Sequence, residues 1–353
     1  MIPLYKSYSD EADVEAVSKV IRRGTGWAEG SEIEEFEGKL INYLGIPGVL
    51  VCNSGTSALH LALLSSGVKH FHEVIVPSFT FIATANAVKF IGAKPVFADI
   101  EEVTYGLDPE DVESKITSHT KAIIAVHYAG CPCRIRELKG IAKKYDLILI
   151  EDAAEALGAD TNGLKVTKYG DCSILSFCAN KIISTGEGGA LVTEDKYIYD
   201  KAKLLRSHGR NESDNFISLG YNFRMSTMTA ALGCSQMSKV ESLIEKRQQI
   251  AKWYEEYGVT GFNPPDNYRH VYQLYTIRTP KRDLIQRTLK DNDIISKVYF
   301  YPIHQSGYYR KQTWDVASLP ITEKVSSEVL SLPMYPDLIE EEVKTICQII
   351  KSI

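Results

Sequence analysis

The sequence lacks three features, and each absence argues against a class of protein. No run of eighteen apolar residues occurs in the 353-residue chain, so no membrane-spanning helix is predicted and a membrane is not an expected partner. Basic residues are not in excess, because 40 Lys and Arg stand against 45 Asp and Glu and give a formal net charge of −5. Proteins that bind nucleic acid normally carry excess positive charge, so no nucleic-acid partner is expected. Residues 1–17 contain no apolar signal-peptide core, so secretion is not predicted.

Cysteine is sparse and unpaired. The seven cysteines are scattered, and their odd number fits no disulfide framework, which indicates reduced thiols and a cytoplasmic location. The pair in "CPC" at 131–133 stands alone, whereas a zinc site normally combines two such pairs or a pair with histidines. We therefore expect no metal site.

The sequence does contain a series of short apolar segments with helical stretches between them. The apolar segments are 49–53, 73–78, 94–100, 121–128, 147–153, 173–177 and 190–193. Most are apolar at consecutive positions, which is typical of strands buried on both faces of a largely parallel sheet. Helices are expected at 57–67, 81–92 and 134–146, and the first two end at a glycine, as helices often do. Strands that alternate with helices predict an α/β fold.

The carboxyl-terminal third shows a different pattern. One long helix is expected at about 228–257, because apolar residues recur on one face. A smaller α/β unit follows, with a helix near 281–292 and a final helix from about 338. We therefore predict a large domain at 1–240 and a small domain at 241–353.

The stretch "NSGTS" at 53–57 follows the first predicted strand and begins a helix. The first N–H groups of a helix lack intrahelical partners and carry the positive end of its dipole, so they can bind an anion. Gly55 allows the backbone to approach such an anion closely, and Thr56 adds a hydroxyl. The ordinary alternative is a serine or threonine that only caps the helix.

Two carboxylates end the predicted strand at 147–153. Ligands of open α/β sheets bind at the carboxyl ends of the strands, so Glu151 and Asp152 are expected at that edge. A carboxylate there could keep a pyridine nitrogen protonated. Capping of the following helix is the alternative, and it has equal weight.

Lys181 lies between a short apolar strand and a glycine-rich turn, in "SFCANKIISTGEGGALVT" at 176–193. Its strand-like flanks indicate an inward lysine, which is costly to bury unless it is paired or neutralised. A Schiff base to an aldehyde cofactor is one use of such a lysine, and the Ser176 hydroxyl could bind the phosphate of that cofactor. An ordinary β-hairpin with a glycine turn is the alternative.

The order of the three signals is more specific than any one of them. A phosphate-binding helix start, then an aspartate at a strand end, then Ser-x-x-x-x-Lys form the layout of a pyridoxal 5'-phosphate (PLP) enzyme with the aspartate-aminotransferase fold. This layout predicts PLP fold type I, with a mainly parallel central sheet, helices on both faces and a smaller carboxyl-terminal α/β domain.

Over almost its whole length the sequence resembles the DegT-type (DegT/DnrJ/StrS) nucleotide-sugar aminotransferases, in particular those similar to perosamine synthases. The matching segments are 24–37, 53–63, 74–88, 94–100, 151–159, 176–193 and 220–225. The resemblance implies that Lys181 carries PLP as a Schiff base and that Asp152 pairs with the pyridine nitrogen. It also implies that Gly55, Thr56 and Ser176 bind the phosphate.

The resemblance implies roles for four further residues. Phe81 corresponds to an aromatic ring that stacks on the cofactor. Asn222, in "GYNFRM", corresponds to an asparagine that reaches the phosphate from the other subunit of a homodimer with shared active sites. His304 and Arg224 are the candidate substrate-binding residues, although an arginine at such a position is often only a surface charge.

Glu155 replaces a glutamine that many relatives have near the phenolic oxygen of the cofactor. Glutamate occurs there in subgroups that resemble perosamine synthases, and it could accept a proton from that oxygen. A dehydratase branch of the family has histidine in place of the lysine, so Lys181 favours transamination over dehydration.

The resemblance implies transfer of the amino group of L-glutamate to a nucleotide-linked keto-sugar, most simply a 4-keto-6-deoxy hexose, for glycan or surface polysaccharide biosynthesis. A C3-specific sugar aminotransferase and a PLP-dependent sugar dehydratase or lyase are alternatives on the same fold. A non-catalytic regulatory or binding protein is the alternative from another class. The presence of both Lys181 and Asp152 argues against that last alternative.

Overall fold

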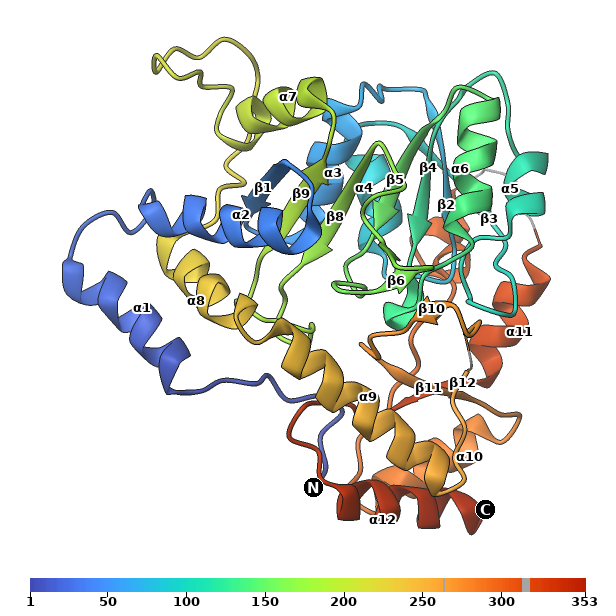
Figure 1. Cartoon of the computed structure of the whole chain (residues 1–353). Helices are drawn as coiled ribbons and strands as arrows, with labels where there is room; N and C mark the ends of the chain where they lie inside the picture. Colours follow the sequence, from blue (N-terminus) through green and yellow to red (C-terminus); the bar gives the residue numbers. More distant parts are fainter. Residues whose placement is uncertain (263, 313–317) are drawn as a thin grey trace.

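The structure is a computed structural model that describes residues 1–262, 264–312 and 318–353. At its centre lies a seven-stranded sheet with the order β1-β9-β8-β5-β4-β2-β3 (Figure 1). Each strand falls on one of the seven predicted apolar segments: β1 Gly48–Cys52, β2 Glu73–Pro77, β3 Lys94–Ala98, β4 Thr120–Val126, β5 Ile148–Asp152, β8 Cys172–Ser176 and β9 Gly189–Thr193. Strand β9 is antiparallel to both neighbours and the other pairs are parallel. The predicted α/β fold with a mainly parallel sheet is therefore confirmed.

Helices cover both faces of this sheet. They are α2 Ser31–Leu44, α3 Gly55–Ser65, α4 Ala83–Phe90, α5 Pro109–Ser114, α6 Ile135–Lys144 and α7 Lys196–Arg206. Alternate residues of β1 pack on opposite faces, because Cβ atoms alternate along a strand. Leu50 and Cys52 belong to the core under α3, α4 and α7, whereas Val49 and Val51 pack with α2 and with α8 Thr227–Met237.

One predicted helix is wrong in its extent. The single helix expected at about 228–257 is two helices, α8 Thr227–Met237 and α9 Val240–Glu256. Between them the N–H groups of Ser238 and Lys239 bond to carbonyls only three residues earlier, which tightens the chain into a turn. The Lys239 ammonium is held by Asp10 and Asp13 at 2.6 and 2.8 Å. No glycine or proline marks this break, so the apolar pattern alone did not reveal it.

A second core lies beyond the start of α9 (Figure 1). It is built from α9, α10 Arg282–Asp291, α12 Glu340–Lys351 and an antiparallel pair, β11 Tyr275–Arg278 with β12 Val329–Leu332. The two predicted helices of this region are α10 and α12, whereas β12 and α11 Pro320–Glu328 had no predicted counterpart. The division at residue 240 coincides with the first residue of α9 and stays a prediction.

The remaining elements are short or peripheral. They are α1 Glu11–Arg23, the small sheet of β10 Tyr268–Arg269, β6 Asp160–Thr161 and β7 Leu164–Lys165, and the 3₁₀ turns Tyr128–Gly130, Ile303–Gln305 and Tyr309–Lys311. All seven cysteines are free thiols. In the described ranges, no helix has the length and apolar character that a membrane span requires. A cytoplasmic location stays a prediction.

Candidate active site

Three strands deliver the predicted site residues to one edge of the sheet. Strands β1 and β8 both run antiparallel to β9, and β5 is parallel to β8, so the carboxyl ends of β1, β5 and β8 meet at the same edge. Asn53 follows β1, Asp152 ends β5 and Ser176 ends β8. The carboxyl edge of an open α/β sheet is where such folds bind ligands.

Lys181 lies on the loop that connects β8 to β9. Because these strands pair antiparallel, with Ser176 opposite Gly189, the hairpin alternative describes the connection correctly. The loop nevertheless turns the lysine inward, and its side chain is 14% exposed. Its Nζ donates to Glu155 Oε1 over 3.3 Å. A buried ammonium needs such a partner, because desolvation alone disfavours its charged form.

Glu155 is fixed by a second contact on its other oxygen. The backbone N–H of Ala129 donates to Glu155 Oε2 over 2.8 Å. Ala129 has a φ of 57°, an unusual conformation for a non-glycine residue, and this turns its N–H toward the glutamate. Glu155 is therefore held with one oxygen on the backbone and the other on Lys181.

Asp152 lies in a dry environment beside Lys181. Thr84 Oγ1 donates to Asp152 Oδ2 over 2.9 Å, and the N–H of Ala154 donates to Oδ1 over 3.2 Å. Burial raises the pKa of the Asp152 carboxyl above its ordinary value of 3.8, although these two donors and the charge of Lys181 oppose the rise. A carboxylate with a raised pKa favours a cationic neighbour, which lowers the cost of its ionisation.

Glu151, the neighbour of Asp152, belongs to a separate structural cluster. Because successive strand residues point to opposite faces, its carboxylate turns away and accepts bonds from the backbone N–H groups of Thr167, Tyr169 and Gly170. His127 Nε2 also lies 3.1 Å from it. Burial opposes ionisation of Glu151, but these donors outweigh it and lower the pKa. Glu151 therefore anchors the loop that contains Thr167, Tyr169 and Gly170. Asp152 is the carboxylate of this strand end that remains available for a ligand at the sheet edge.

The start of α3 packs closely against the end of β8. Ser54 Oγ accepts from the N–H of Ser57 over 3.0 Å, so the capping alternative is right for Ser54. Gly55 and Thr56 occupy the first helical turn, where backbone N–H groups have no partner within the helix. A Cβ on Gly55 would lie 3.3 Å from Ser176 Oγ, and one on Gly189 would lie 2.5 Å from the nitrogen of Gly55. Glycine at both positions allows the start of α3 to lie close to Ser176 and to the start of β9.

Two predicted cofactor residues lie at the surface of this edge. The Phe81 ring is 60% exposed and contacts Phe300 with 6.3 Å between ring centroids. Asn222 is exposed, and its backbone carbonyl accepts from Asn53 Nδ2 over 3.3 Å. The segment "GYNFRM" therefore lies beside the end of β1 in the same chain, and the reach of Asn222 into another subunit stays a prediction.

The two predicted substrate residues have other contacts. His304 is 3% exposed, and its ring nitrogens lie 2.7 Å from Ser78 Oγ and 3.2 Å from Glu323 Oε1. Arg224 donates to Ser207 Oγ over 3.2 Å and lines a hollow of about 770 Å³ beside α7. Neither residue contacts the pair of Lys181 and Glu155, so their substrate roles stay predictions.

Thr84 and Ala129 were not among the predicted site residues. Thr84 lies in the first turn of α4, after β2, and Ala129 in the turn that follows β4. Strands β2 and β4 run parallel to β5, so both turns emerge at the same edge. The predicted order of strands could therefore have indicated these two residues. In an open parallel sheet, every segment that follows a strand is a candidate neighbour of the site.

The residues present fit PLP. The turn at Gly55 and Thr56, with Ser176 beside it, supplies N–H and hydroxyl donors for a phosphate. Asp152 supplies a buried carboxylate for a cationic ring nitrogen, and Lys181 supplies an amine. A mainly parallel α/β sheet that carries this set at its carboxyl edge defines the class of PLP fold type I enzymes.

Within that class, the chain belongs to the DegT/DnrJ/EryC1/StrS aminotransferase family, which matches residues 7–351. It is 38% identical to the GDP-perosamine synthase of Caulobacter vibrioides over 89% of this chain and 88% of that protein. It is 36% identical to a UDP-N-acetyl-3-dehydro-alpha-D-glucosamine 3-aminotransferase of Acidithiobacillus ferrooxidans over 91% of this chain and 88% of that protein. A similar solved structure is that of Helicobacter pylori PseC, an aminotransferase involved in pseudoaminic acid biosynthesis. The two structures align with a TM-score of 0.92 and 31% sequence identity, over 99% of this chain and 98% of PseC. The chain is therefore an enzyme of the aminotransferase class, and aminotransferases of this family are PLP-dependent.

Proposed function

We propose that this enzyme moves the amino group of L-glutamate to the keto group of a nucleotide-linked 4-keto-6-deoxy hexose. The observation that carries the proposal is the buried contact of Lys181 with Glu155, with Asp152 close by. The name of the Caulobacter relative, GDP-perosamine synthase, supports a nucleotide-linked sugar as the acceptor. The product would enter glycan or surface polysaccharide biosynthesis.

Lys181 has two tasks in this proposal. It first provides the amine that holds PLP, and once displaced by the amino donor it moves a proton between two carbons of the reacting system. PLP, when bound, supplies the electron sink that makes the proton at the substrate carbon acidic. Glu155 Oε1 lies 3.3 Å from Nζ and can balance the charge of the ammonium or accept a proton from it. The same amine serves both half-reactions, because transamination returns through the same proton transfer.

Asp152 holds a fixed negative charge where a protonated pyridine nitrogen needs a partner. The dry surroundings that raise its pKa also strengthen its interaction with a cation, because the local dielectric is low. Thr84 fixes the orientation of the carboxylate through Oδ2. The first turn of α3 and Ser176 would hold the phosphate of PLP, while Asp152 would pair with its ring nitrogen.

We also propose a homodimer with shared active sites. The loop that follows α7 projects from the body of the molecule (Figure 1) and exposes three large apolar side chains: Phe216 at 72%, Ile217 at 60% and Leu219 at 79%. Such a cluster on a projecting loop is suited to burial against another subunit. The loop is continuous with Asn222, whose exposed side chain would then reach the partner's phosphate site.

The test is transfer of a labelled amino group. The holoenzyme is incubated with ¹⁵N-L-glutamate and GDP-, UDP- or dTDP-linked 4-keto-6-deoxy hexoses, and the products are examined by mass spectrometry. The proposal expects a ¹⁵N-labelled amino sugar with one of these nucleotides. Unlabelled dehydrated sugar or free ammonium would instead indicate the dehydratase or lyase alternative, and no turnover of any sugar would favour the regulatory or binding alternative.

Amination at C3 is a second candidate function. The Acidithiobacillus relative is named as a 3-aminotransferase of a 3-dehydro sugar, at an identity close to that of the perosamine synthase. The same assay with a 3-keto sugar nucleotide distinguishes the two. Labelled product from the 3-keto substrate alone would replace C4 amination by C3 amination and leave the roles of Lys181 and Asp152 unchanged.

A further inference from the structure

The loop that carries Lys181 is held by a side chain that does not belong to the site. Residues 177–188 connect β8 to β9. On the carboxyl-terminal side of Lys181, the backbone N–H of Ser184 donates to Gln236 Oε1 over 3.4 Å. Gln236 lies in the last turn of α8 and is 2% exposed. This amide therefore meets the lysine loop inside the protein, where no water competes for the bond.

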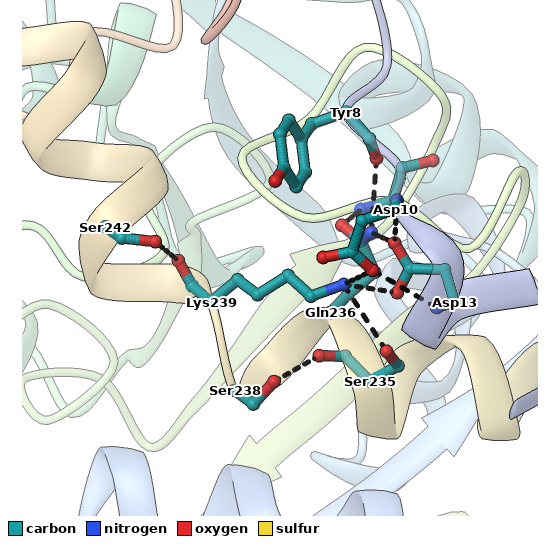
Figure 2. Close-up of polar contacts among 9 residues, drawn as sticks. Tyr8, Asp10, Asp13, Ser235, Gln236, Ser238, Lys239 and Ser242 are labelled. Carbon is teal, nitrogen blue, oxygen red and sulfur yellow. Dashed lines mark hydrogen bonds and ion pairs between the residues drawn. The ribbon is translucent and has the colours of Figure 1, made fainter. Parts of the chain in front are cut away.

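Gln236 also binds the amino-terminal segment (Figure 2). Its Nε2 donates to the carbonyl of Tyr8 over 3.1 Å and to Asp13 Oδ2 over 2.7 Å. Both amide hydrogens and the amide oxygen of Gln236 are thus engaged. A buried amide with every group satisfied has one preferred orientation, because each alternative leaves a polar atom unpaired.

Lys239 anchors the same segment without touching the lysine loop. Its Nζ lies 2.6 Å from Asp10 Oδ1 and 2.8 Å from Asp13 Oδ1, and Figure 2 shows its side chain reaching across to both carboxylates. Lys239 therefore offers a matched comparison. Its loss would weaken the docking of residues 8–13 while leaving the bond between Gln236 and Ser184 in place.

A second contact reaches the loop on the other side of Lys181. Ser7 Oγ donates to the carbonyl of Ala179 over 2.5 Å. The amino-terminal segment thus touches the loop directly before the lysine, and through Gln236 it touches the loop after the lysine. Contacts on both sides restrict the direction in which the lysine side chain leaves the backbone.

We propose that Gln236 is a positioning residue for Lys181: its bond to Ser184 fixes the loop against α8, so that Nζ stays directed at Glu155. The importance of this for PLP rests on the proposed function, whereas the contact itself exists without PLP. It follows that a side chain of α8, remote in sequence from Lys181, controls how tightly the lysine is placed.

The test measures hydrogen exchange of the loop in the PLP-free protein by mass spectrometry, on peptides within 177–188. Three proteins are compared: wild type, Gln236→Met, which keeps the size of the side chain but removes all three hydrogen bonds, and Lys239→Met. Loss of one buried hydrogen bond makes local opening roughly fivefold more frequent. We therefore expect exchange about fivefold faster in Gln236→Met and within twofold of wild type in Lys239→Met.

A separate measurement links the loop to the cofactor. Titration with PLP, followed by the visible absorbance of lysine-bound PLP, should show weaker apparent affinity for Gln236→Met and unchanged affinity for Lys239→Met. If the wild type develops no such band, the proposed function fails, and hydrogen exchange still decides whether Gln236 holds the loop.

Two results would overturn the proposal. One is loop exchange in Gln236→Met that equals wild type, and the other is equal acceleration in both variants, which would trace the effect to general loosening of the amino-terminal segment. If Gln236→Met does not fold, residue-resolved hydrogen exchange of the wild type takes its place. The N–H of Ser184, which donates to Gln236 Oε1, should be protected like the N–H of Thr185, which donates to the carbonyl of Phe177. Rapid exchange of the Ser184 N–H beside a protected Thr185 would overturn the proposal.

Discussion

Asp152 and Glu155 lie three positions apart in the sequence. Both carboxylates lie near Lys181, but their hydrogen-bond partners and their desolvation differ. Glu155 shares its charge with a backbone N–H and the lysine, whereas Asp152 is desolvated and its pKa is raised. Carboxylates whose environments differ in this way usually take different roles. Here Glu155 is suited to pair with the Lys181 ammonium or to accept a proton from it. Asp152 is suited to pair with a permanently protonated ring nitrogen of the cofactor.

The substitution Lys181→Ala should abolish aminotransfer and the covalent attachment of PLP, because no other residue supplies the amine in the proposed scheme. Activity should fall by at least about 10⁴-fold, which is the usual upper contribution of a positioned proton carrier. The check combines the ¹⁵N transfer assay with borohydride reduction and peptide mapping. Reduced PLP on the peptide that contains Lys181 in the wild type, and on none in the variant, is the expected result.

The substitution Asp152→Asn should lower activity while stabilising the PLP-free protein at neutral pH. A raised pKa means that the folded protein binds this proton more tightly than the unfolded chain, so the ionised carboxyl costs stability at neutral pH and the cost is absent below pH 3.8. Activity should fall by about 10²-fold or more, as when a preorganised charge is lost.

Thermal unfolding of the PLP-free proteins at pH 7.5 and near pH 4 checks the stability of the Asp152→Asn variant. The variant should melt higher than wild type at pH 7.5, and the difference should shrink toward pH 4. A variant that melts lower at pH 7.5 would show that the bonds from Thr84 and Ala154 outweigh the cost of burial.

At the scale of single residues, the candidate site residues at strand ends could be predicted from the sequence. The residues that hydrogen-bond to them or to the lysine loop were not predicted. Asp152 and Lys181 could be predicted as candidates because apolar segments deliver them to an edge. Gln236 and Ala129 were not, because their bonds to Ser184 and Glu155 join positions that only the folded chain brings together. A backbone donor such as the N–H of Ala129 also carries no signal in the identity of its residue.

At the scale of elements, the site depends on how closely α3 approaches the strands beside it. Gly189 begins β9, and a Cβ there would lie 2.5 Å from the backbone of Ser54 and the nitrogen of Gly55. Real Cβ contacts are not that short, so a side chain would push the start of α3 away from Ser176. The proposed phosphate-binding turn at the start of α3 therefore depends on glycine at a strand end.

The substitution Gly189→Ala should weaken PLP binding by at least tenfold and destabilise the protein by about 1–3 kcal/mol, a typical cost of overpacking. Gly140→Ala is the matched control, because Gly140 lies on the exposed face of α6 with no atom near its added Cβ. That control should leave PLP affinity unchanged and raise stability slightly, since alanine favours a helix. Chemical denaturation and PLP titration of both variants provide the check, and equal affinities would contradict the account.

The strands were the most predictable elements, because short apolar runs rich in isoleucine, such as those of β4 and β5, are typical of strands buried on both faces of a parallel sheet. The break between α8 and α9 was not predictable, because it depends on Lys239 and carboxylates from the other end of the chain. Strand β12 was also missed. Its four residues follow directly on α11, and its pairing with β11 joins distant segments.

At the scale of the whole molecule, the projecting loop after α7 is the feature that a single chain does not explain. Phe216, Ile217 and Leu219 would be costly to expose and favourable to bury in a dimer. Arg210, at the base of the same loop, pairs with Asp214 within the loop and with Glu29 outside it, and the pair with Glu29 ties the loop to the body of the chain. The loop is thus held in place while its apolar side chains face outward.

The substitution Leu219→Asp should dissociate the proposed dimer, because it places a charge at the most exposed of these apolar side chains. Light scattering after size-exclusion chromatography should give the mass of one chain for this variant and of two for the wild type. Leu284→Asp is the control, since Leu284 is an exposed apolar residue on α10, and it should remain dimeric. A monomeric wild type, or a Leu219→Asp dimer with full activity, would contradict the shared-site proposal.

The central claim, that Lys181 and its neighbours pass an amino group through PLP, is tested most directly by the absorbance spectrum of the purified enzyme. PLP is added first and L-glutamate second. The account predicts a visible band of lysine-bound PLP that gives way to the near-ultraviolet band of pyridoxamine phosphate, and that returns when the correct keto-sugar nucleotide is supplied. A visible band that glutamate leaves unchanged would contradict glutamate as the donor, and no visible band at all would contradict the assignment of Lys181.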